Sequence, residues 1–404
     1  MKTTQCEKYC FLISLVIIGF TSVAHATTQY RISGLGTAQG FVSSTAIGIN
    51  NQGNTVASSG DPFDGLSRGF YNLEGSVATD IPFLPGYFYN WAVAINDNNL
   101  IAVDNRVTVD TGYDVSIYNI DTNTSTVLGS GIANDINNSG IVLGRSSNDM
   151  TLFSTSGNTV VNEFGSYAFA EGYALNNNGA FTGFVKGGTS GGTQAFFYIN
   201  NTITELGTLP NAGRSFGRGI NDLNQVVGSA ETYIVNTLYN KAFFWENGVM
   251  SDLGTLVGHD TAAAVDINNL GQIIGSSGKK SSGQSTFFIH ENGVMMSLED
   301  QIINSAGWYL SGLKAINDAG LIIGHGHYNG QKQAFLLTPL VSGDIAPHTA
   351  PDGLVNVGDL LLLTRMVLGL MTYTNDELIS ADLNNNATLD SGDIVLMLQL
   401  LVTP

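Results

Sequence analysis

Residues 264–277 read AVDINNLGQIIGSS, and a variant of the same string, KAINDAGLIIGHG, follows at residues 314–326. The core of both is an aliphatic residue, an Asn, and then Asn or Asp. Seven copies of this core occur, at residues 49–51, 95–97, 136–138, 175–177, 220–222, 267–269 and 316–318. Successive copies lie 39 to 49 residues apart. A period of this size, kept over most of a chain, indicates a repeat architecture.

Each copy predicts a β-hairpin. In the copy at 264–277, residues 264–267 end one strand and residues 272–275 begin its partner. The Asn-Asn-Leu-Gly between them suits a turn, because Asn tolerates a left-handed backbone and Gly adopts positive φ freely. Ala264 and Gly275 are small, as is typical where two backbones lie close together.

A second phrase follows the hairpin in the better-preserved repeats, for example AFFWENGVMSDLGTL at residues 242–256. It contains an apolar aromatic strand, an Asn-Gly turn and a further apolar strand. One repeat therefore holds about four short strands, the size of one blade of a β-propeller.

The N-terminal end of the repeat region has one extra strand, and the C-terminal end lacks one. Residues 30–36, YRISGLG, resemble the last strand of a repeat but precede the first motif copy, and the final repeat stops at residues 334–339 without that strand. We therefore predict an all-β, seven-bladed β-propeller-like domain over residues 27–340, closed by pairing of the N-terminal strand with the last blade. The alternative is an open β-solenoid, which needs no such exchange.

The composition argues against two classes of binding partner. The chain has 404 residues, of which 12% are charged and 49 are Gly, and its net charge is −18. This negative charge argues against nucleic acid or an anionic membrane surface as a partner.

The N-terminus predicts export. Lys2 and Lys8 precede the apolar run FLISLVIIGF, and an A-x-A site follows at residues 24–26. We expect a secretory signal peptide over residues 1–26, cleaved after Ala26; the alternative, a retained membrane anchor, would have a short span. Cys6 and Cys10 are the only cysteines, so the chain after cleavage has no disulfide, thiolate metal site or cysteine nucleophile.

The repeat phrases resemble a known family. The combination seen in GINDLNQVVGSA (219–230), KAFFWENGV (241–249) and SDLGTL (251–256) is similar to the HAF family of extracellular repeat proteins. The likeness covers about 310 residues. It implies an extracellular repeat protein and carries little information about activity, because the family is defined by its repeat.

Aromatic residues gather in front of three motif copies and predict a ligand-binding surface. The candidate residues are Tyr87, Tyr89, Trp91, Trp308 and Tyr309, and residues 167–173 form a third aromatic group. On a propeller these segments would be equivalent, and their flat apolar faces would suit sugar rings or a protein partner. The alternative is that they pack between blades.

The composition changes after Pro339. Residues 352–370 and 381–402 each contain an Asp/Asn-rich loop that ends in Asp, followed by an apolar helix. Together, residues 341–404 resemble a type I dockerin, a small domain with a duplicated calcium loop. The resemblance implies a Ca²⁺ loop with ligands at Asp382, Asn384, Asn386, Thr388 (through its backbone carbonyl) and Asp393. Oxygen ligands on alternate residues with a closing carboxylate suit Ca²⁺.

Both loops depart from the family pattern. Ala387 stands where the second loop normally turns on Gly. In the first loop, Asp352, Asn356 and Asp359 match, but counting back from Asp359 puts His348 at the first position; Asp344 could serve only if the loop bulges by four residues. Between the loops, residues 374–377, TNDE, predict a capped start for a short helix.

The two terminal helices are apolar almost all round, so we expect them to dock on the propeller or on a cohesin-like partner. The preferred interpretation is a secreted or surface-associated, non-catalytic binding protein with a calcium-dependent docking module. The alternative is a polysaccharide-active enzyme, a glycoside hydrolase or lyase, recruited through its dockerin.

Overall fold

The structure is a computed structural model that describes residues 28–61, 66–73, 76–108, 112–188, 191–235, 237–303, 305–346, 355–384 and 386–402. The predicted signal peptide, residues 1–26, lies outside this range. No helix within it is long and apolar enough to cross a membrane.

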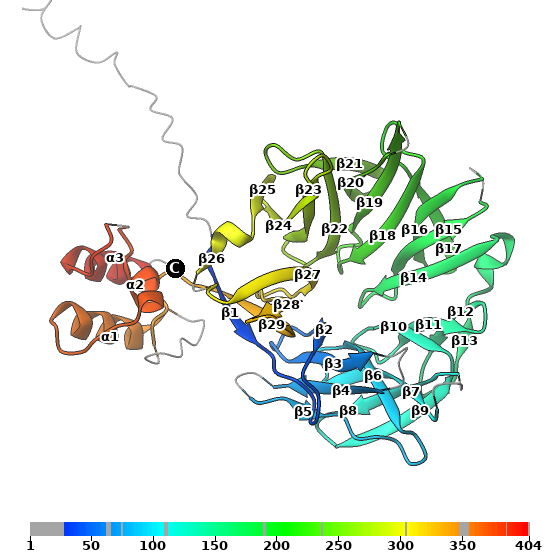
Figure 1. Ribbon diagram of the computed structural model, residues 1–404, viewed down its shortest axis with the longest axis horizontal. Helices are drawn as coiled ribbons and strands as arrows, with labels where there is room; N and C mark the ends of the chain where they lie inside the picture. Colours follow the sequence, from blue (N-terminus) through cyan, green and yellow to red (C-terminus); the bar gives the residue numbers. More distant parts are fainter. Residues whose placement is uncertain are drawn as a thin grey trace, which may run out of the picture.

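The repeat region consists of antiparallel sheets, and each repeat supplies consecutive strands (Figure 1). The first three repeats form separate four-stranded sheets. Their strands are β2 (Thr45–Ile49), β3 (Thr55–Asp61), β4 (Leu66–Asn72) and β5 (Thr79–Asp80); β6 (Tyr89–Ile95), β7 (Leu100–Arg106), β8 (Asp114–Asn119) and β9 (Thr124–Ser130); and β10 (Ile132–Ile136), β11 (Val142–Ser146), β12 (Asp149–Phe153) and β13 (Thr159–Val160).

The next two repeats are joined into one eight-stranded sheet by a parallel pair between Thr193 and Arg214. Their strands are β14 (Phe169–Leu175), β15 (Phe181–Lys186), β16 (Thr193–Ile199) and β17 (Thr202–Gly207), then β18 (Arg214–Ile220), β19 (Val226–Ile234), β20 (Thr237–Glu246) and β21 (Val249–Gly254). The sixth repeat forms a four-stranded sheet of β22 (Thr261–Ile267), β23 (Ile273–Lys279), β24 (Gln284–Glu291) and β25 (Val294–Ser297).

The last sheet combines the two ends of the repeat region. It contains β27 (Trp308–Ile316), β28 (Ile322–Tyr328), β29 (Gln331–Pro339), the N-terminal strand β1 (Tyr30–Gly34) and the short β26 (Ile302–Ile303). β1 runs antiparallel to β29, with Tyr30 opposite Pro339 and Gly34 opposite Phe335. The exchange predicted from the sequence is therefore confirmed. The parallel pairing of β26 with the outer edge of β1 was not predicted.

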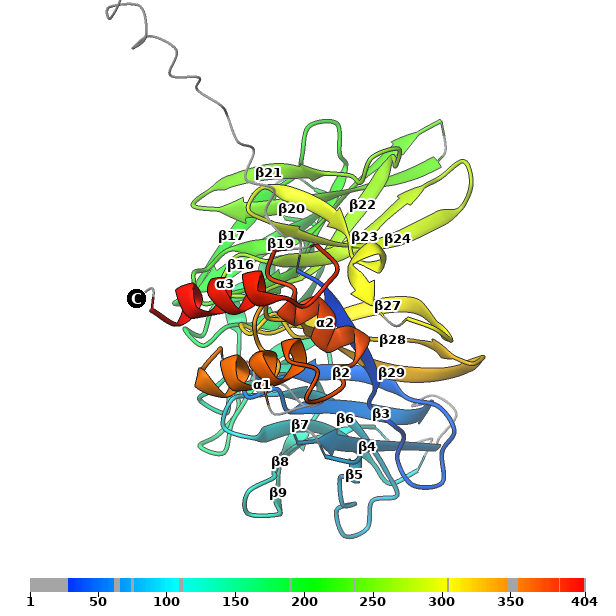
Figure 2. The same ribbon diagram turned by 90° about the vertical axis from the view of Figure 1, so that its left-hand side faces the viewer.

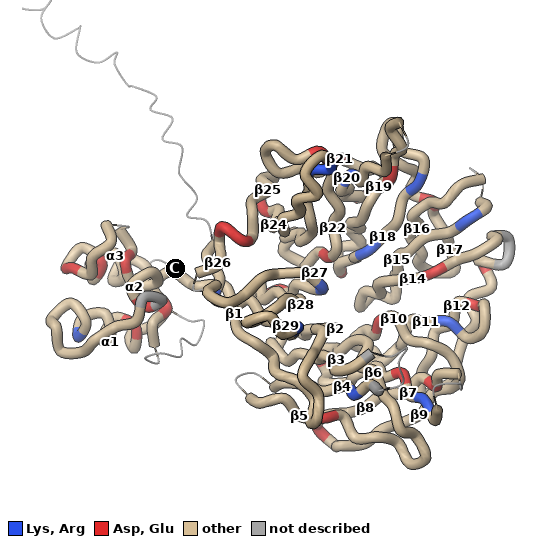
Figure 3. The backbone as a smooth tube through the Cα atoms, viewed as in Figure 1, with Lys and Arg blue, Asp and Glu red and all other residues tan. Residues whose placement is uncertain are grey.

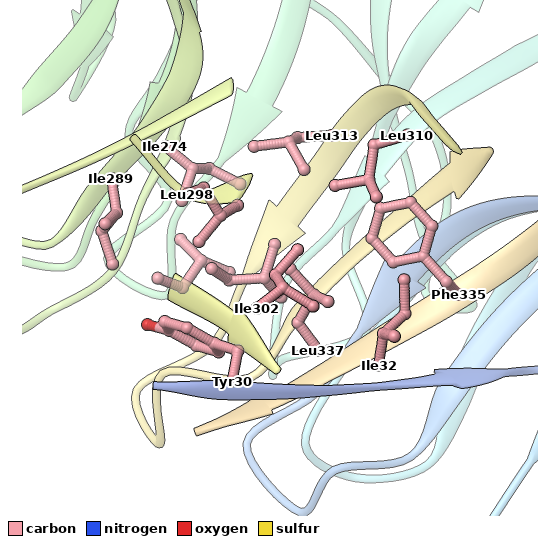
Figure 4. Close-up of a cluster of buried hydrophobic side chains, with 12 residues drawn as sticks. Tyr30, Ile32, Ile274, Ile289, Leu298, Ile302, Leu310, Leu313, Phe335 and Leu337 are labelled. Carbon is pink, nitrogen blue, oxygen red and sulfur yellow. The ribbon is translucent and has the colours of Figure 1, made fainter. Parts of the chain in front are cut away.

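Apolar side chains hold this closing strand in place. Tyr30 and Ile32 of β1 are buried in one cluster with Leu337, Phe335 and Ile302 (Figure 4). Because the partners of β1 come from the other end of the repeat region, this strand and the last repeat stabilise each other.

The hairpins have the predicted turns. In five motif copies the turn Gly has φ between 72° and 80°. Asn99 and Asn224, which replace this Gly in the second and fifth copies, adopt φ of 56° and 62°. At Gly275 an added Cβ would strike the carbonyl oxygen of Ala263 on the partner strand, which explains the small residue there.

The first strands of the repeats, β2, β6, β10, β14, β18, β22 and β27, are called the inner strands below. Each contacts the inner strand of the next repeat, and β27 contacts β2. The sheets therefore stand around a common axis, as in a β-propeller (Figure 1). 3₁₀ helices at Asn162–Ser166 and Glu299–Gln301 interrupt the strand pattern.

Three helices follow the repeats and lie together beside the ring (Figure 2). They are α1 (Val357–Val367), α2 (Asn375–Ala381) and α3 (Ser391–Val402). The predicted capped start of α2 is confirmed, because the Thr374 and Glu377 side chains each bond the other residue's backbone N–H. A small core around Leu363, Met366 and Met397 holds the helices together.

Candidate functional site

A circle of asparagines surrounds the axis. The Asn that follows each inner strand is buried, and its Nδ2 donates to the main-chain carbonyl of the equivalent Asn in the next repeat at 2.8 to 3.4 Å. The members are Asn50, Asn96, Asn137, Asn176, Asn221, Asn268 and Asn317. The bond from Asn317 back to the Asn50 carbonyl, 2.9 Å, completes the circle.

The same side chains also hold their own turns. The Oδ1 of Asn268, for example, accepts the backbone N–H groups of Leu270 (3.1 Å) and Gln272 (2.9 Å). One carboxamide thus fixes a turn and links two repeats. This double use explains why Asn recurs in every motif copy.

The next residue of each copy forms a second circle. Its backbone N–H donates to the Oδ1 of the equivalent residue in the following repeat at 2.8 to 2.9 Å. The members are Asn51, Asp97, Asn138, Asn177, Asp222, Asn269 and Asp318. No two of the three aspartates are neighbours in this circle, and adjacent asparagines donate to their Oδ2 atoms. These residues surround a cavity of about 170 Å³, and their polar atoms are used in linking the repeats.

Further along the axis, the inner strands share a β-bulge. In every inner strand the pairing with the second strand skips one residue, two positions before the end of the strand. The skipped residues are Ile47, Val93, Asn134, Tyr173, Arg218, Val265 and Lys314. A bulge re-aims a side chain, and all of these residues line one axial cavity of about 620 Å³.

The cavity wall has an apolar part and a polar part. Ile47 and Val93 are apolar, and Trp91 adds an aromatic face beside them. The next repeats around the ring contribute Asn134, Tyr173 and Arg218. Basic and acidic positions both occur on the inner strands around the axis (Figure 3).

Arg218 is held by aromatic rings. Its guanidinium lies 4.7 Å from the Tyr173 ring centroid and 5.5 Å from that of Phe216. Stacking of this kind fixes the plane of the guanidinium and leaves its edge N–H groups available.

Three buried aspartates, of which Asp104 lines the cavity, have a raised pKa. Burial raises the pKa of Asp104 to about 8, partly offset by the backbone N–H of Ala133, which donates to it at 2.9 Å. Burial likewise raises the pKa of Asp135 to about 6 and that of Asp266 to about 7, and Lys314 acts in the opposite direction on both.

These aspartates also link adjacent repeats. Asp135 accepts the N–H of Leu175 at 2.7 Å, and Asp266 accepts that of Ile316 at 3.0 Å. Asp104 occupies the position of Ser58 in the first repeat, whose hydroxyl accepts the N–H of Ala92 in the same way.

The predicted aromatic residues are distributed over different parts of the ring. Trp91 lines the axial cavity. Trp308 packs on the cluster of the last sheet, with its ring 5.1 Å from Tyr328, and Tyr309 is exposed. The Tyr87 hydroxyl donates to Asp114 at 2.7 Å, and Tyr89 pairs with Arg106 in the β6–β7 ladder. Of the five candidate residues only Trp91 lines the cavity, where Tyr173 of the third aromatic group joins it.

The second predicted calcium loop is closed by Asp393, which is buried. Its Oδ1 accepts the N–H of Asn384 at 3.2 Å, and its Oδ2 that of Asp390 at 2.9 Å. Asp382 accepts the N–H groups of Asn386 and Ala387 at 3.0 and 2.6 Å. Ala387 has φ of 63°, the conformation that Gly normally supplies in such a loop.

In the middle of this loop, the side-chain oxygens accept hydrogen bonds from the residue two positions later in the chain. The Asn384 Oδ1 accepts the N–H of Asn386 at 3.1 Å, and the Asn386 Oδ1 accepts the N–H and hydroxyl of Thr388. Among the described residues, no group of three or more His, Cys, Asp and Glu side chains is arranged to hold a metal ion.

The first loop follows the same plan. Asp359 is buried, and its Oδ1 accepts the N–H groups of Ile345 (2.7 Å) and Ala346 (2.6 Å) while its Oδ2 accepts that of Asn356 (2.7 Å). The bond to Ala346, two residues after Asp344, matches the bond from Asn384, two residues after Asp382. Asp344 is therefore the counterpart of Asp382, with four more residues before the closing Asp. Asp352 and His348 lie outside the described residues.

Sequence reasoning did not single out Arg218, Lys314, Asp104, Asp135 and Asp266. A signal for Arg218 and Lys314 was present, because both stand two positions before the aliphatic residue of the motif, where other repeats have Ile, Val, Asn or Tyr. The side chain at this variable position faces the axis only because of the bulge.

Comparisons with known proteins give information on the fold of the repeat region. No family model and no curated protein matches the chain. Among solved structures, the β-propeller domain of the trilobed protease from Pyrococcus furiosus matches 80% of this chain and 100% of its own, with 8% identity and a TM-score of 0.50. Virginiamycin B lyase from Staphylococcus aureus matches over 77% and 99% of the two chains, with 11% identity and a TM-score of 0.45.

At such identities only the fold is comparable. The Pyrococcus furiosus domain is described as having an open velcro topology, whereas here β1 pairs with β29. The repeat region of this chain is thus a β-propeller scaffold.

Proposed function

We propose that this protein is an exported, seven-bladed β-propeller that binds a ligand on its axis, and that a calcium-dependent dockerin-like module anchors it to a partner. The observation that carries the binding proposal is the axial cavity. Every inner strand turns one bulged residue into it, and these residues range from Ile to Lys, whereas the residue two positions later is always Ile or Leu. Variation at the cavity-facing position of a regular scaffold is expected for a binding site.

A glycan is the ligand class that we favour. The cavity combines an aromatic face at Trp91 with hydrogen-bonding groups at Asn134 and Tyr173, as sugar-binding sites do. A glycan array probed with the purified protein tests this, with reducing-sugar and lyase assays run in parallel on the bound glycans. Binding without turnover supports the proposal, and turnover supports the enzyme described below.

The C-terminal helices support a calcium-dependent module. The two loops close on buried aspartates that accept equivalent backbone N–H groups, as expected of a duplicated loop. The oxygens of Asp382, Asn384, Asn386 and Asp393 are of the kind that Ca²⁺ prefers, so the donor set fits this ion. Bound Ca²⁺ would offset the clustered negative charge and stiffen the loop before α3.

A docking partner would cover the helices. Val357 and Leu361 on α1, Leu368 directly after it, and Val395 and Val402 on α3 are exposed in the described part of the chain. A cohesin-like module is the partner that the dockerin likeness implies. Export rests on the signal sequence of residues 1–26.

The alternative function is a glycoside hydrolase or polysaccharide lyase. One observation favours it: Asp104 lines the cavity with a pKa of about 8, and perturbed carboxyl groups in a cavity are candidates for acid–base catalysis. If Asp104→Asn abolished turnover of a bound glycan, the enzyme would replace the non-catalytic proposal.

A further inference from the structure

The axial cavity contains two cationic side chains from nearby repeats. Arg218 projects from the bulge of β18 and Lys314 from that of β27, with Val265 of the intervening repeat between them. Neither forms an ion pair within the described residues, which contain ion pairs at Arg68, Arg145, Arg214 and Lys241.

The nearby carboxyl groups do not balance the two cations equally. Lys314 interacts with Asp135 and Asp266, so part of its charge is compensated. Glu231 lies 3.8 Å from Arg214, and burial raises the pKa of Asp104 to about 8, which favours its neutral form at neutral pH. Glu231 also lines the cavity, but Arg218 forms no ion pair with it within the described residues. Because Arg218 is stacked on two rings, its edge can form paired hydrogen bonds with a planar anion such as a carboxylate.

Across the ring from Arg218, Trp91 and Val93 give the cavity wall an apolar surface, with Asp104 of the same repeat beside them. Trp91 and Val93 belong to the second repeat and Arg218 to the fifth, three repeats away in a circle of seven. A ligand that spans the cavity would therefore contact a flat apolar surface on one side and a guanidinium on the other. The cavity volume of about 620 Å³ is in the range of small-molecule sites.

We propose that the cavity recognises a uronic acid residue of a glycan, with the sugar ring against Trp91 and the carboxylate on Arg218. This proposal rests on the glycan-binding function above and specifies its ligand class. The net charge of −18 repels polyanions in general, so recognition depends on the local contact with Arg218.

A matched pair of probes isolates the carboxylate. Binding of a galacturonate trisaccharide is compared by calorimetry with binding of its fully methyl-esterified form, which has the same ring but no charge. We expect the acid to bind about tenfold more tightly or better, since one charge-assisted bidentate contact is lost in the ester. Benzoate serves as a carboxylate without a sugar ring and should bind far more weakly than the acid.

Each cavity variant introduces the residue that another repeat has at the same position. We therefore expect these variants to fold like the native protein. Arg218→Val places the Val of the second and sixth repeats at the same bulge, and it should remove the preference for the acid over the ester. Trp91→Ala copies Ala263, and it should weaken both probes. Lys332→Gln, an exposed cation on β29 outside the cavity lining, is the control and should change neither.

The outcomes separate the two proposals. Equal binding of acid and ester by the native protein, an unchanged preference in Arg218→Val, or benzoate binding as tightly as the acid would overturn the uronate proposal and leave a neutral-glycan function intact. If no sugar binds on the array either, the glycan-binding function itself fails.

Discussion

At the scale of single residues, the motif Asn is the most heavily used side chain of the ring. Its Oδ1 accepts N–H groups from its own turn, and its Nδ2 reaches the next repeat. Asn99 and Asn224 add to this network, because their side chains accept from Asn50 and Asn176 of the preceding repeats at 3.2 and 2.8 Å. A change at the motif Asn therefore affects two repeats at once.

Asn268→Ala should reduce the free energy of unfolding by about 3 kcal/mol, because it leaves the N–H groups of Leu270 and Gln272 and the Asn317 carbonyl without their partner. Urea denaturation measures this loss. Asn178→Ala is the control: the side chain of this exposed Asn donates to the Asp222 carbonyl at 2.6 Å, and its loss should cost about 1 kcal/mol or less. Equal costs would show that the circle of asparagines is not a main source of stability.

The raised pKa of Asp104 predicts that the stability of the fold depends on pH. Its pKa is about 8 in the fold and about 4 in an unfolded chain, so the folded state holds a proton that the unfolded state releases over this window. Stability should therefore fall as the pH rises from about 4 to about 8. Asp104→Ser copies Ser58 and keeps an oxygen for the Ala133 N–H, so its melting temperature should fall less over this range. Parallel melting curves of the two proteins between these pH values would contradict the assignment.

At the scale of elements, β1 is the strand on which closure depends. It pairs with β29 on one side and β26 on the other, and its Tyr30 is fully buried. Without it, the last sheet would expose an edge and its apolar cluster would be open to water.

Deletion of residues 27–37 should lower the melting temperature and the cooperativity of the whole repeat region, because it removes the contact between its two ends. Calorimetry on the truncated and the full protein provides the comparison. An unchanged midpoint and an unchanged cooperativity would mean that the ring does not depend on this closure.

The C-terminal loops should respond unequally to calcium. Asp382 to Asp393 has regular spacing and should bind first, whereas the loop that ends at Asp359 has four extra residues and should bind weakly or after the other has ordered. Asp393→Ala should abolish most of the Ca²⁺-induced protection against proteolysis, and Asp359→Ala only part. Both aspartates also accept backbone N–H groups, so each variant is compared with itself, with and without Ca²⁺. Absence of calorimetric heat at millimolar Ca²⁺ would remove the calcium proposal.

At the scale of the whole molecule, the position around the ring and along the axis decides what an aromatic residue does. Trp91 lies within β6, four residues before Ile95, and lines the cavity, whereas Trp308 begins β27, eight residues before Ile316, and its ring packs on Phe335 and Tyr328. Two tryptophans that both precede a motif copy thus have different surroundings.

Replacement of the two tryptophans should separate binding from stability. Trp308→Ala should reduce the free energy of unfolding by about 3 kcal/mol, since it removes a large side chain from the closing cluster, and should leave glycan binding unchanged. Trp91→Ala should weaken binding and leave the urea midpoint nearly unchanged. A binding defect in both variants with little loss of stability would instead support one shared aromatic platform.

The sequence by itself determined the local and periodic features of this protein. The seven motif copies, the Asn-Gly turns, the strand exchange of residues 30–36 and the capped start at Thr374 all depend on backbone preferences and on alternation of apolar residues, which neighbouring residues reveal. The two loop-helix segments after Pro339 could be recognised for the same reason, although the four-residue difference between the loops left the counterpart of Asp382 open; the bond from Ala346 to Asp359 makes Asp344 that counterpart.

Only the tertiary structure decided which residues face the axis. A bulge arises from the pairing of two strands, so the sequence of one strand does not show that Arg218 or Lys314 turns inward. The circle of asparagines closes through a bond between Asn317 and Asn50, 267 residues apart, and the acidity of Asp104 follows from its burial against the next repeat. Such contacts exist only once the ring has closed, because each depends on atoms that a neighbouring repeat supplies.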